Sequence, residues 1–134
     1  MANILLIEDE EPIRRVMVKI LIDENKSYQI TEASHGKEGL EKLTRDNFDL
    51  ILCDIKMPKM DGMEVLQQAR KKNISTPFIM LTGHGNLETA VEAMKLGAYD
   101  FIPKPPDLNR LLTAVRNALQ VKTLVKENKA LKKE

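Results

Sequence analysis

The stretch that decides the fold is Leu50-Ile51-Leu52-Cys53-Asp54, in which four consecutive apolar residues end at an acid. A strand with one face in water alternates apolar and polar residues, whereas a strand covered on both faces is apolar throughout. The stretch therefore predicts a short central strand that is buried between two layers and carries a carboxylate at its end.

Four further short runs are interpreted as strands, and two of them are as continuous as the first. They comprise residues 4–7, 28–31, 78–81 and 99–102. The weaker run at 28–31 predicts a strand nearer an edge of the sheet. Between the runs lie stretches with helical periodicity, at residues 12–23, 36–45, 62–72 and 87–95. This regular alternation predicts a doubly wound α/β fold, because parallel strands need crossover helices.

Composition is that of one ordinary globular domain. The chain has 134 residues, 43% hydrophobic and 31% charged, and a net charge of +1, which gives no bias toward nucleic acid or anionic membranes. The single cysteine, Cys53, excludes an internal disulfide and fits a reducing cytosol. No apolar run approaches the roughly 20 residues of a membrane span, and the first residues predict a buried strand rather than a signal peptide. A cytoplasmic protein without membrane contact is expected.

Polar side chains follow four of the five expected strands. Glu8 and Asp9 follow the first strand, Asp54 the third, Thr82 the fourth and Lys104 the fifth. Ligands of doubly wound sheets bind outside the carboxyl ends of the strands. We therefore expect three carboxylates, a hydroxyl and an ammonium to meet at one edge of the sheet.

This combination indicates phosphoryl chemistry with a divalent cation. Clustered carboxylates repel one another, and a hard cation such as Mg²⁺ relieves the repulsion while keeping several waters. Asp9 and Asp54 can supply direct ligands, with Glu8 reaching through water. Lys104 adds a fixed positive charge, and the carboxylate of Asp54 can attack phosphorus to form an acyl phosphate. Each residue alone would be read as an ordinary cap, loop or surface residue, so the inference depends on their conjunction.

Four motifs in this order resemble the response regulator receiver domain of bacterial two-component systems. They are Leu5-Leu6-Ile7-Glu8-Asp9-Glu10, Asp54 followed by Met57-Pro58-Lys59-Met60-Asp61-Gly62, then Leu81-Thr82-Gly83, and Lys104-Pro105. The resemblance extends to about Leu119. It implies a flavodoxin-like sheet of five parallel strands in the order 2-1-3-4-5, with five flanking helices of which the last is extended.

The resemblance also assigns roles around Asp54, which would accept a phosphoryl group from a partner histidine kinase. Glu8 and Asp9 match the acidic pair of the family, which binds Mg²⁺ or Mn²⁺ together with Asp54. The backbone carbonyl of Lys56 matches the third protein ligand of the metal. Lys104 matches the lysine of the site, and its bond to the following proline is cis in many relatives. Such a domain is a regulatory switch rather than an enzyme, and its own chemistry is limited to gaining and losing this phosphoryl group.

Thr82 and Phe101 match the switch residues of the family. Phosphorylation adds charge and acceptor oxygens, to which Thr82 and Lys104 can bond, pulling in the loop at residues 83–86. Phe101, where the family often has Tyr, would then turn inward and change the surface of the fourth helix, fifth strand and fifth helix. His84 could influence hydrolysis of the acyl phosphate, although an ordinary loop residue is the preferred interpretation.

The last helix is expected to begin after Asp107, acting as an N-cap, and to run past the end of a compact domain. A packing face is expected from Leu108, Leu111, Leu112, Val115 and Leu119, so that residues 1–119 form the receiver domain. Residues 120–134 would form a helical linker extension. Their 3-4-3 spacing predicts a short coiled coil, or alternatively a solvated helix end, with the seam formed by Val121, Leu124, Asn128 and Leu131.

Residues 82–101 look especially like receivers of NtrC-type sigma-54-dependent transcription activators. In those proteins, the extended last helix joins a dimeric receiver to an ATPase. A homodimer through the fourth helix, fifth strand and fifth helix, or through the extension, is therefore expected, with an output domain in cis if the chain is a fragment. No Walker A or helix-turn-helix pattern occurs here, so this chain is not expected to bind DNA itself.

Three alternatives to the switch are a phosphatase, a nucleotide-binding module and an interaction module. A phosphatase of the haloacid dehalogenase type would place a second acid two residues after the nucleophile, where this chain has Lys56. A nucleotide-binding module would need a phosphate-cradling loop after the first strand, where residues 8–11 are all acidic. A receiver-like interaction module that is never phosphorylated stays open, although the complete set of acids, Thr82 and Lys104 disfavours it.

Overall fold

The computed structural model describes residues 2–83 and 87–132, with residues 121–132 described as backbone only. Strands and helices alternate along the chain, as the apolar runs predicted. The strands are β1 (Asn3–Ile7), β2 (Gln29–Ala33), β3 (Leu50–Asp54), β4 (Phe78–Thr82) and β5 (Asp100–Pro103). The helices are α1 (Glu11–Glu24), α2 (Gly36–Arg45), α3 (Gly62–Lys71), α4 (Leu87–Lys95) and α5 (Leu108–Lys132).

The five strands form one parallel sheet in the order β2-β1-β3-β4-β5. The predicted fold class and strand order are confirmed. The weaker apolar run forms β2, which lies at an edge of the sheet as expected. In the register of the central strands, Asp54 is paired with Leu81, so the end of β3 lies directly beside the end of β4.

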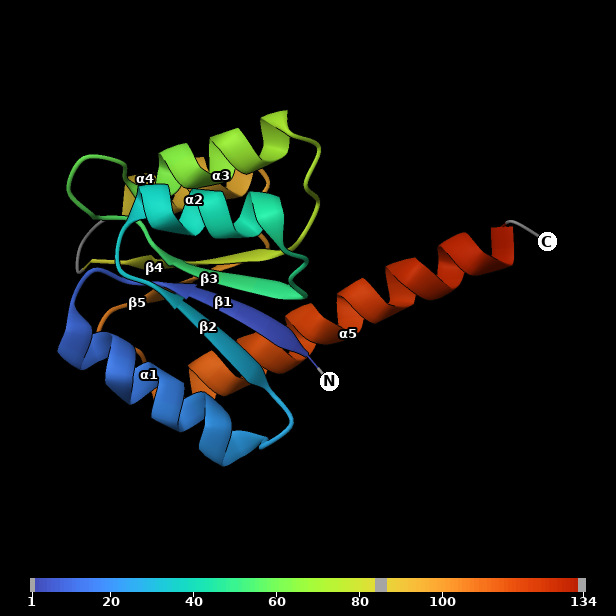
Figure 1. Cartoon of the computed structure of the whole chain (residues 1–134), viewed down its shortest axis with the longest axis horizontal. Helices are drawn as coiled ribbons and strands as arrows, with labels where there is room; N and C mark the ends of the chain where they lie inside the picture. The colour runs from blue at the N-terminus through green and yellow to red at the C-terminus, as the bar shows by residue number, and fades with distance from the viewer. Residues whose placement is uncertain (1, 84–86, 133–134) are drawn as a thin grey trace.

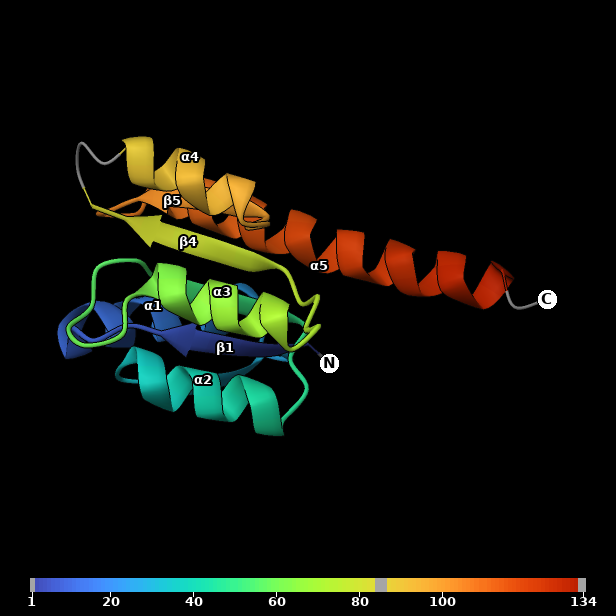
Figure 2. The ribbon, with the colours of Figure 1, turned by 90° about the horizontal axis from the view of Figure 1, so that it is seen from above.

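Helices cover both faces of the sheet. Helices α1 and α5 lie on one face, and α2, α3 and α4 lie on the other (Figures 1 and 2). Successive residues of a strand point to opposite faces, and each face is buried here, which explains the unbroken apolar runs. In β3, for example, Leu50 and Leu52 pack beneath α1 and α5, whereas Ile51 and Cys53 pack beneath α2 and α3.

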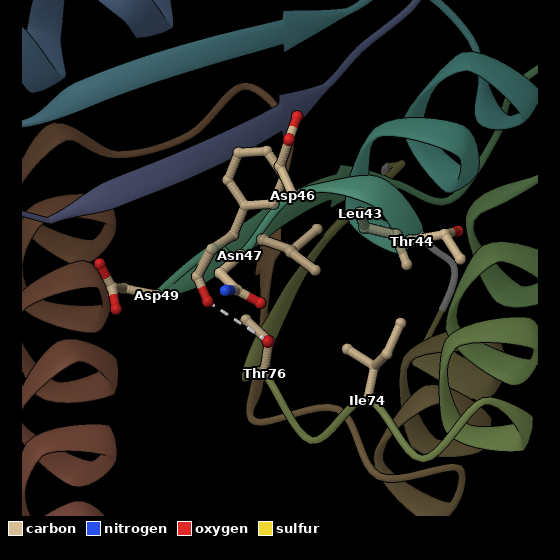
Figure 3. Close-up of a pocket in the computed structure, with 9 residues that line it drawn as sticks. Leu43, Thr44, Asp46, Asn47, Asp49, Ile74 and Thr76 are labelled. Atoms are coloured by element: carbon tan, nitrogen blue, oxygen red, sulfur yellow. Dashed lines mark hydrogen bonds between the residues drawn. The ribbon is translucent and has the colours of Figure 1, made fainter.

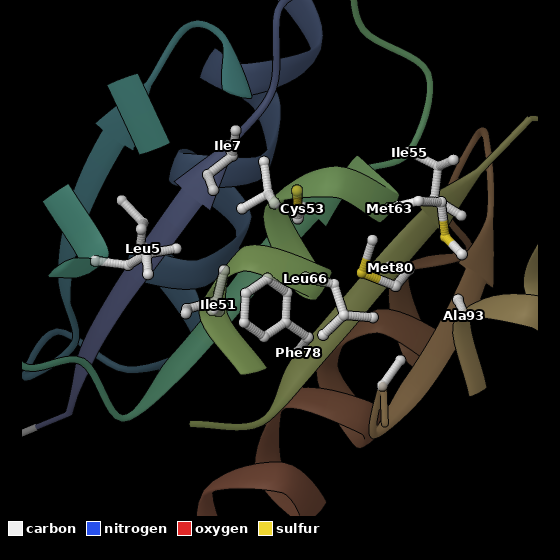
Figure 4. Packing of buried hydrophobic residues seen from close by; sticks show 14 of the residues in the cluster. Leu5, Ile7, Ile51, Cys53, Ile55, Met63, Leu66, Phe78, Met80 and Ala93 are labelled. Carbon is white, nitrogen blue, oxygen red and sulfur yellow. The ribbon is translucent and has the colours of Figure 1, made fainter. Parts of the chain in front are cut away.

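The core under α2, α3 and α4 is drawn in Figure 4. Phe78 is fully buried at its centre, and Leu66 of α3 and Ala93 of α4 belong to the same cluster. Cys53 is also fully buried there, and burial raises the pKa of its thiol. Cys53 is therefore a small core residue rather than a reactive thiol.

Side chains close the exposed first turns of several helices. Asp61 accepts a hydrogen bond from the backbone N–H of Glu64 at 2.9 Å, and Asp107 accepts one from that of Arg110 at 3.2 Å. The predicted N-cap at Asp107 is therefore confirmed. His35 is exposed and caps α2, because its side chain accepts a hydrogen bond from the backbone N–H of Glu38. Gly97 has a φ of 101° just after α4, a conformation that favours glycine.

The first half of helix α5 packs on the sheet. Leu111, Leu112 and Val115 are buried as predicted, but Leu108 is 50% exposed, so its assignment to the packing face was wrong. Leu108 is the first residue of α5, and burial begins one turn later. Ala114 and Ala118, which had not been assigned to this face, are buried there.

The second half of α5 projects beyond the body of the domain (Figure 1). The helix runs without interruption through the expected boundary at residue 119 and continues to Lys132. The side chains expected to form a coiled-coil seam, from Val121 to Leu131, lie outside the described side chains. Within residues 2–83 and 87–132, no helix has the length and apolarity that crossing a membrane requires.

Candidate functional site

The turn between β1 and α1 brings two acids to the carboxyl edge of the sheet. Glu8 is fully buried, and its backbone N–H donates to the carbonyl of Ala33 in β2 at 3.0 Å. Glu8, Asp9 and Asp54 each offer a carboxylate oxygen, and these oxygens lie within 4.8 Å of one another. The structure therefore brings together the three carboxylates that the strand ends predicted to converge.

Asp54 is the last residue of β3 and is only 2% exposed. Its Oδ1 accepts a hydrogen bond from the backbone N–H of Lys56 at 3.3 Å, so the following loop folds back over the carboxylate. The N-terminus of α3 closes on the same backbone, because the N–H of Gly62 donates to the carbonyl of Ile55 at 2.8 Å. A Cβ at Gly62 would lie 2.3 Å from the carbonyl oxygen of Asp54, so only glycine allows this approach.

Lys104 provides the positive charge of the site. Its Nζ lies 2.9 Å from Asp54 Oδ2, to which it donates, and 2.7 Å from Glu8 Oε1. Burial alone would lower the pKa of Lys104, but its contacts with Glu8 and Asp54 outweigh burial and raise it. The ammonium is therefore held in its charged form. The backbone N–H of Lys104 donates to the carbonyl of Thr82 at 2.7 Å, and the Lys104–Pro105 peptide bond is cis.

The acids retain unsatisfied bonding capacity despite Lys104. Burial raises the pKa of Glu8 to about 7, the Lys104 ammonium opposes this, and the neighbouring Asp54 adds to it. Glu8 Oε1 meets Lys104 at ion-pair distance without the alignment of a hydrogen bond. Asp9 Oδ1 is buried without a hydrogen-bond partner among the described residues. Buried oxygens without donors are costly, and all-oxygen ligands suit a hard divalent cation, so these residues fit Mg²⁺.

The two expected switch residues lie on neighbouring strands. Thr82 ends β4, is 4% exposed and is paired with Pro103 of β5. Phe101 is paired with Met80 and is partly buried against the core beneath α3 and α4. Lys56, expected to offer its carbonyl, has an exposed side chain. His84 lies outside the described residues.

Two of the cavities in the described part of the protein lie at opposite ends of the sheet. One of about 600 Å³ opens beside the acid cluster and is lined by Asp9, His35, Pro58 and Met60 among others. It gives solvent a route to Asp9. The other, of about 390 Å³, lies at the amino ends of β3 and β4, where Thr76 donates to the carbonyl of Phe48 at 3.3 Å (Figure 3). It lies at the end of the sheet opposite to Glu8, Asp9 and Asp54.

Arg14 is a residue of this edge that the sequence argument did not single out. Its guanidinium donates to the carbonyl of Glu8 at 2.8 Å and to Glu32 Oε1 at 3.0 Å. The spacing contains a signal, because Arg14 lies three and seven residues before Met17 and Leu21, the buried residues of α1. It therefore shares their inward face, whereas the adjacent Arg15 is exposed.

Residues 4–116 match the sequence profile of the family described as "Response regulator receiver domain". The regulatory protein AtoC of Escherichia coli is 35% identical over 125 residues, which cover 93% of this chain and 27% of AtoC. The response regulator protein PilR of Pseudomonas aeruginosa is 38% identical over 87% of this chain and 26% of PilR. The chain therefore spans about a quarter of the length of these relatives.

Two solved structures of response regulators are also similar to this chain. A response regulator receiver domain protein from Clostridium thermocellum is 36% identical with a TM-score of 0.85, covering 93% of this chain and 99% of that one. NtrX from Brucella abortus is 35% identical with a TM-score of 0.88, covering 97% of this chain and 29% of NtrX. The likeness to NtrC-type regulators that the sequence suggested is confirmed. This chain belongs to the response regulator receiver domain family.

Proposed function

We propose that Asp54 accepts a phosphoryl group from a sensor histidine kinase, with Mg²⁺ or Mn²⁺ beside it, and so controls an output outside this chain. The observation that carries the proposal is the cluster of Glu8, Asp9 and Asp54 around the ammonium of Lys104. A purely structural ion pair would need one carboxylate for one ammonium. Three carboxylates leave excess negative charge that a divalent cation offsets.

The transfer step follows from the chemistry of the Asp54 carboxylate at the end of β3. A carboxylate oxygen attacks the phosphorus of a phosphohistidine, the new O–P bond forms as the N–P bond breaks, and the leaving imidazole takes up a proton. Lys104, held in its charged form, compensates the charge on the phosphoryl oxygens from a fixed position. The chain thus contributes to gaining and losing its own phosphoryl group, and no further enzymatic activity is proposed.

A cation would be held by Asp9 and Asp54, with Glu8 through water and the carbonyl of Lys56 as a further oxygen ligand. When bound, it neutralises charge on the phosphoryl oxygens and orients them for in-line attack. Asp9 Oδ1 has no hydrogen-bond partner among the described residues, which supports this ligand set, because a buried carboxylate oxygen is costly without a donor or a metal.

Phosphorylation would reach the surface through Thr82 and Phe101. The hydroxyl of Thr82 bonds the new phosphoryl oxygens, and Phe101 then occupies the space that Thr82 leaves. Partial burial of Phe101 supports this step, because part of the residue's surface is still accessible to solvent and could become buried. The face of α4, β5 and α5 would change with it. That face already presents Leu87, Val91 and Met94 to solvent at helical spacing.

The output is proposed to be a sigma-54-dependent transcription regulator, because this chain is similar to NtrC-type regulators. Fusion of that output in cis is proposed because the relatives are several times longer than this chain. Residues 1–119 would then form the receiver and residues 120–134 a helical linker. Dimers would form through the face of α4, β5 and α5 or through the extension of α5. The continuous helix to Lys132 supports a rigid connection between receiver and output.

Beryllofluoride, which stands in for a phosphoryl group, tests the proposal. We expect Mg²⁺ and beryllofluoride to shift the amide NMR signals of β4, α4 and β5 in the wild type and to leave Asp54→Asn unchanged. Asp61→Asn, which alters a neighbouring acid that caps α3, serves as the matched control and should respond like the wild type. Signals that do not move, or that move equally in Asp54→Asn, would contradict the proposal.

A further inference from the structure

Arg14 connects three elements at the edge of the sheet that carries the acids. From the first turns of α1, its guanidinium reaches the carbonyl of Glu8 at 2.8 Å and Glu32 Oε1 of β2 at 3.0 Å. Its side chain is only 15% exposed. An ordinary surface arginine on an exposed helix face would keep its charged end in water.

The backbone around Glu8 is held from both sides. Its N–H donates to the carbonyl of Ala33 in β2, and its carbonyl accepts from Arg14. That carbonyl belongs to the peptide unit that joins Glu8 to Asp9. Fixing this unit therefore limits the directions in which both acidic side chains leave the backbone.

Strand β2 contributes to the turn twice through adjacent residues. The carbonyl of Ala33 binds the turn directly, and the carboxylate of Glu32 orients the guanidinium of Arg14. Arginine presents several donors in a rigid planar fork, so one side chain can satisfy both acceptors at once. A lysine presents a single point of charge and would fix the geometry less well.

We propose that Arg14, oriented by Glu32, is a positioning residue that sets the Glu8–Asp9 turn for binding a divalent cation. The inference rests on the proposed function and adds a residue that touches neither metal nor phosphoryl group. Outer partners that orient metal ligands typically contribute about 10- to 100-fold to metal affinity. Arg14 acts through a backbone carbonyl rather than through a ligand side chain.

Positioning and simple charge make opposite predictions for this residue. A guanidinium near the site repels a cation, so if charge alone mattered, removing Arg14 would tighten Mg²⁺ binding. If Arg14 positions the turn, its removal weakens Mg²⁺ binding despite the more favourable charge. The sign of the change in affinity therefore separates the two roles.

The test is calorimetric titration of the whole chain with Mg²⁺ alone. We expect the Mg²⁺ dissociation constant to rise about tenfold in Arg14→Gln and by less in Glu32→Gln. Arg15→Gln is the matched control, because Arg15 is the adjacent arginine, is 76% exposed and pairs only with Glu11 among the described residues. We expect Arg15→Gln to bind like the wild type. Thermal unfolding in EDTA gives the stability of each variant separately.

A second variant keeps the test informative if Arg14→Gln does not fold. Arg14→Lys retains the charge and the aliphatic stem, and we expect intermediate weakening. Unchanged or tighter Mg²⁺ binding in the folded Arg14 variants would overturn the inference, even if their stability in EDTA were reduced. Absence of Mg²⁺ binding by the wild type would instead contradict the proposed function, so the two failures are distinguishable.

Discussion

Lys104 Nζ lies 2.9 Å from Asp54 Oδ2, although β4 lies between β3, which ends at Asp54, and β5, which Lys104 follows. The same ammonium also reaches Glu8, which follows β1, one strand further across the sheet. One long side chain therefore spans the carboxyl edge and compensates two acids that are almost entirely buried.

Lys104→Ala is expected to destabilise the metal-free protein at pH 8 by about 3 kcal/mol, because it leaves the buried carboxylates without the ammonium group that compensates their charge. Urea unfolding in EDTA measures this loss, and saturating Mg²⁺ should restore part of it. Lys71→Ala, at an exposed position of α3, provides the control for removing one positive charge. Equal stability of the two variants would show that the ammonium is not compensating the acids.

The raised pKa of Glu8 predicts how the stability of the metal-free protein depends on pH. The folded protein holds the proton up to about pH 7, whereas the unfolded chain releases it near 4.5. The contribution of Glu8 to the free energy of unfolding is therefore fully present below pH 4.5 and is lost as pH rises through 7. Glu8→Gln should reduce this fall in urea-unfolding stability between pH 5 and 8 measured in EDTA. A fall of the same size in Glu8→Gln would assign it to other groups.

Gly62→Ala is expected to displace the loop after Asp54, because the new Cβ would lie 2.3 Å from the carbonyl oxygen of Asp54. Overpacking against backbone typically costs about 1–3 kcal/mol. We expect this loss in urea unfolding, with slower phosphorylation by acetyl phosphate at saturating Mg²⁺. Glu64→Ala, an exposed change in the same helix, should retain the wild-type phosphorylation rate. A wild-type rate in Gly62→Ala would mean that the loop tolerates the displacement.

Arg70 joins the end of α3 to the turn after α4. Its guanidinium donates to the carbonyls of Ile74, Thr76 and Gly97 at 2.7, 3.1 and 2.9 Å and lies over the ring of Phe78. Arg70→Ala leaves these acceptors without their donor, and we expect a loss of about 2 kcal/mol in urea unfolding. Hydrogen exchange should accelerate most around Gly97. Uniform acceleration across the domain would argue against a local role.

Removal of residues 120–134 is expected to weaken self-association, because the extension of α5 would contribute to the dimer. Sedimentation velocity of the shortened and full chains over a range of concentrations checks this. Leu111, Leu112 and Val115 remain to pack on the sheet, so the shortened chain should keep its stability. Identical sedimentation of the two chains would place the dimer contact elsewhere or show that the receiver is monomeric.

Much of the fold could be predicted, because a strand that is buried on both faces of the sheet is apolar throughout its sequence. The run at residues 50–53 is apolar throughout, and the structure places its alternate residues in the two separate cores. The exposure of Leu108 could not be predicted, because helical spacing shows which face a residue shares but not at which turn the helix begins to contact the sheet. The burial of Ala118 in α5 was missed for a related reason, since a small side chain carries little hydrophobic signal.

At the site, the convergence of acids at one edge followed from the strand ends alone. The contact between Lys104 and Glu8 did not, since it depends on the order of strands in the sheet and on the reach of one side chain. Arg14 was missed because two adjacent arginines at the start of a helix resemble a solvated pair. The spacing to Met17 and Leu21 places Arg14 on the inward face, but its contacts with Glu8 and Glu32 are visible only in the tertiary structure, where Arg14 is 15% and Arg15 76% exposed.

The central claim is that Asp54 becomes phosphorylated, and intact mass spectrometry after incubation with acetyl phosphate and Mg²⁺ tests it most directly. We predict a single labile adduct with the mass of one phosphoryl group, which is absent from Asp54→Asn and does not form in EDTA. No adduct on the folded wild-type protein, or the same adduct on Asp54→Asn, would contradict the account.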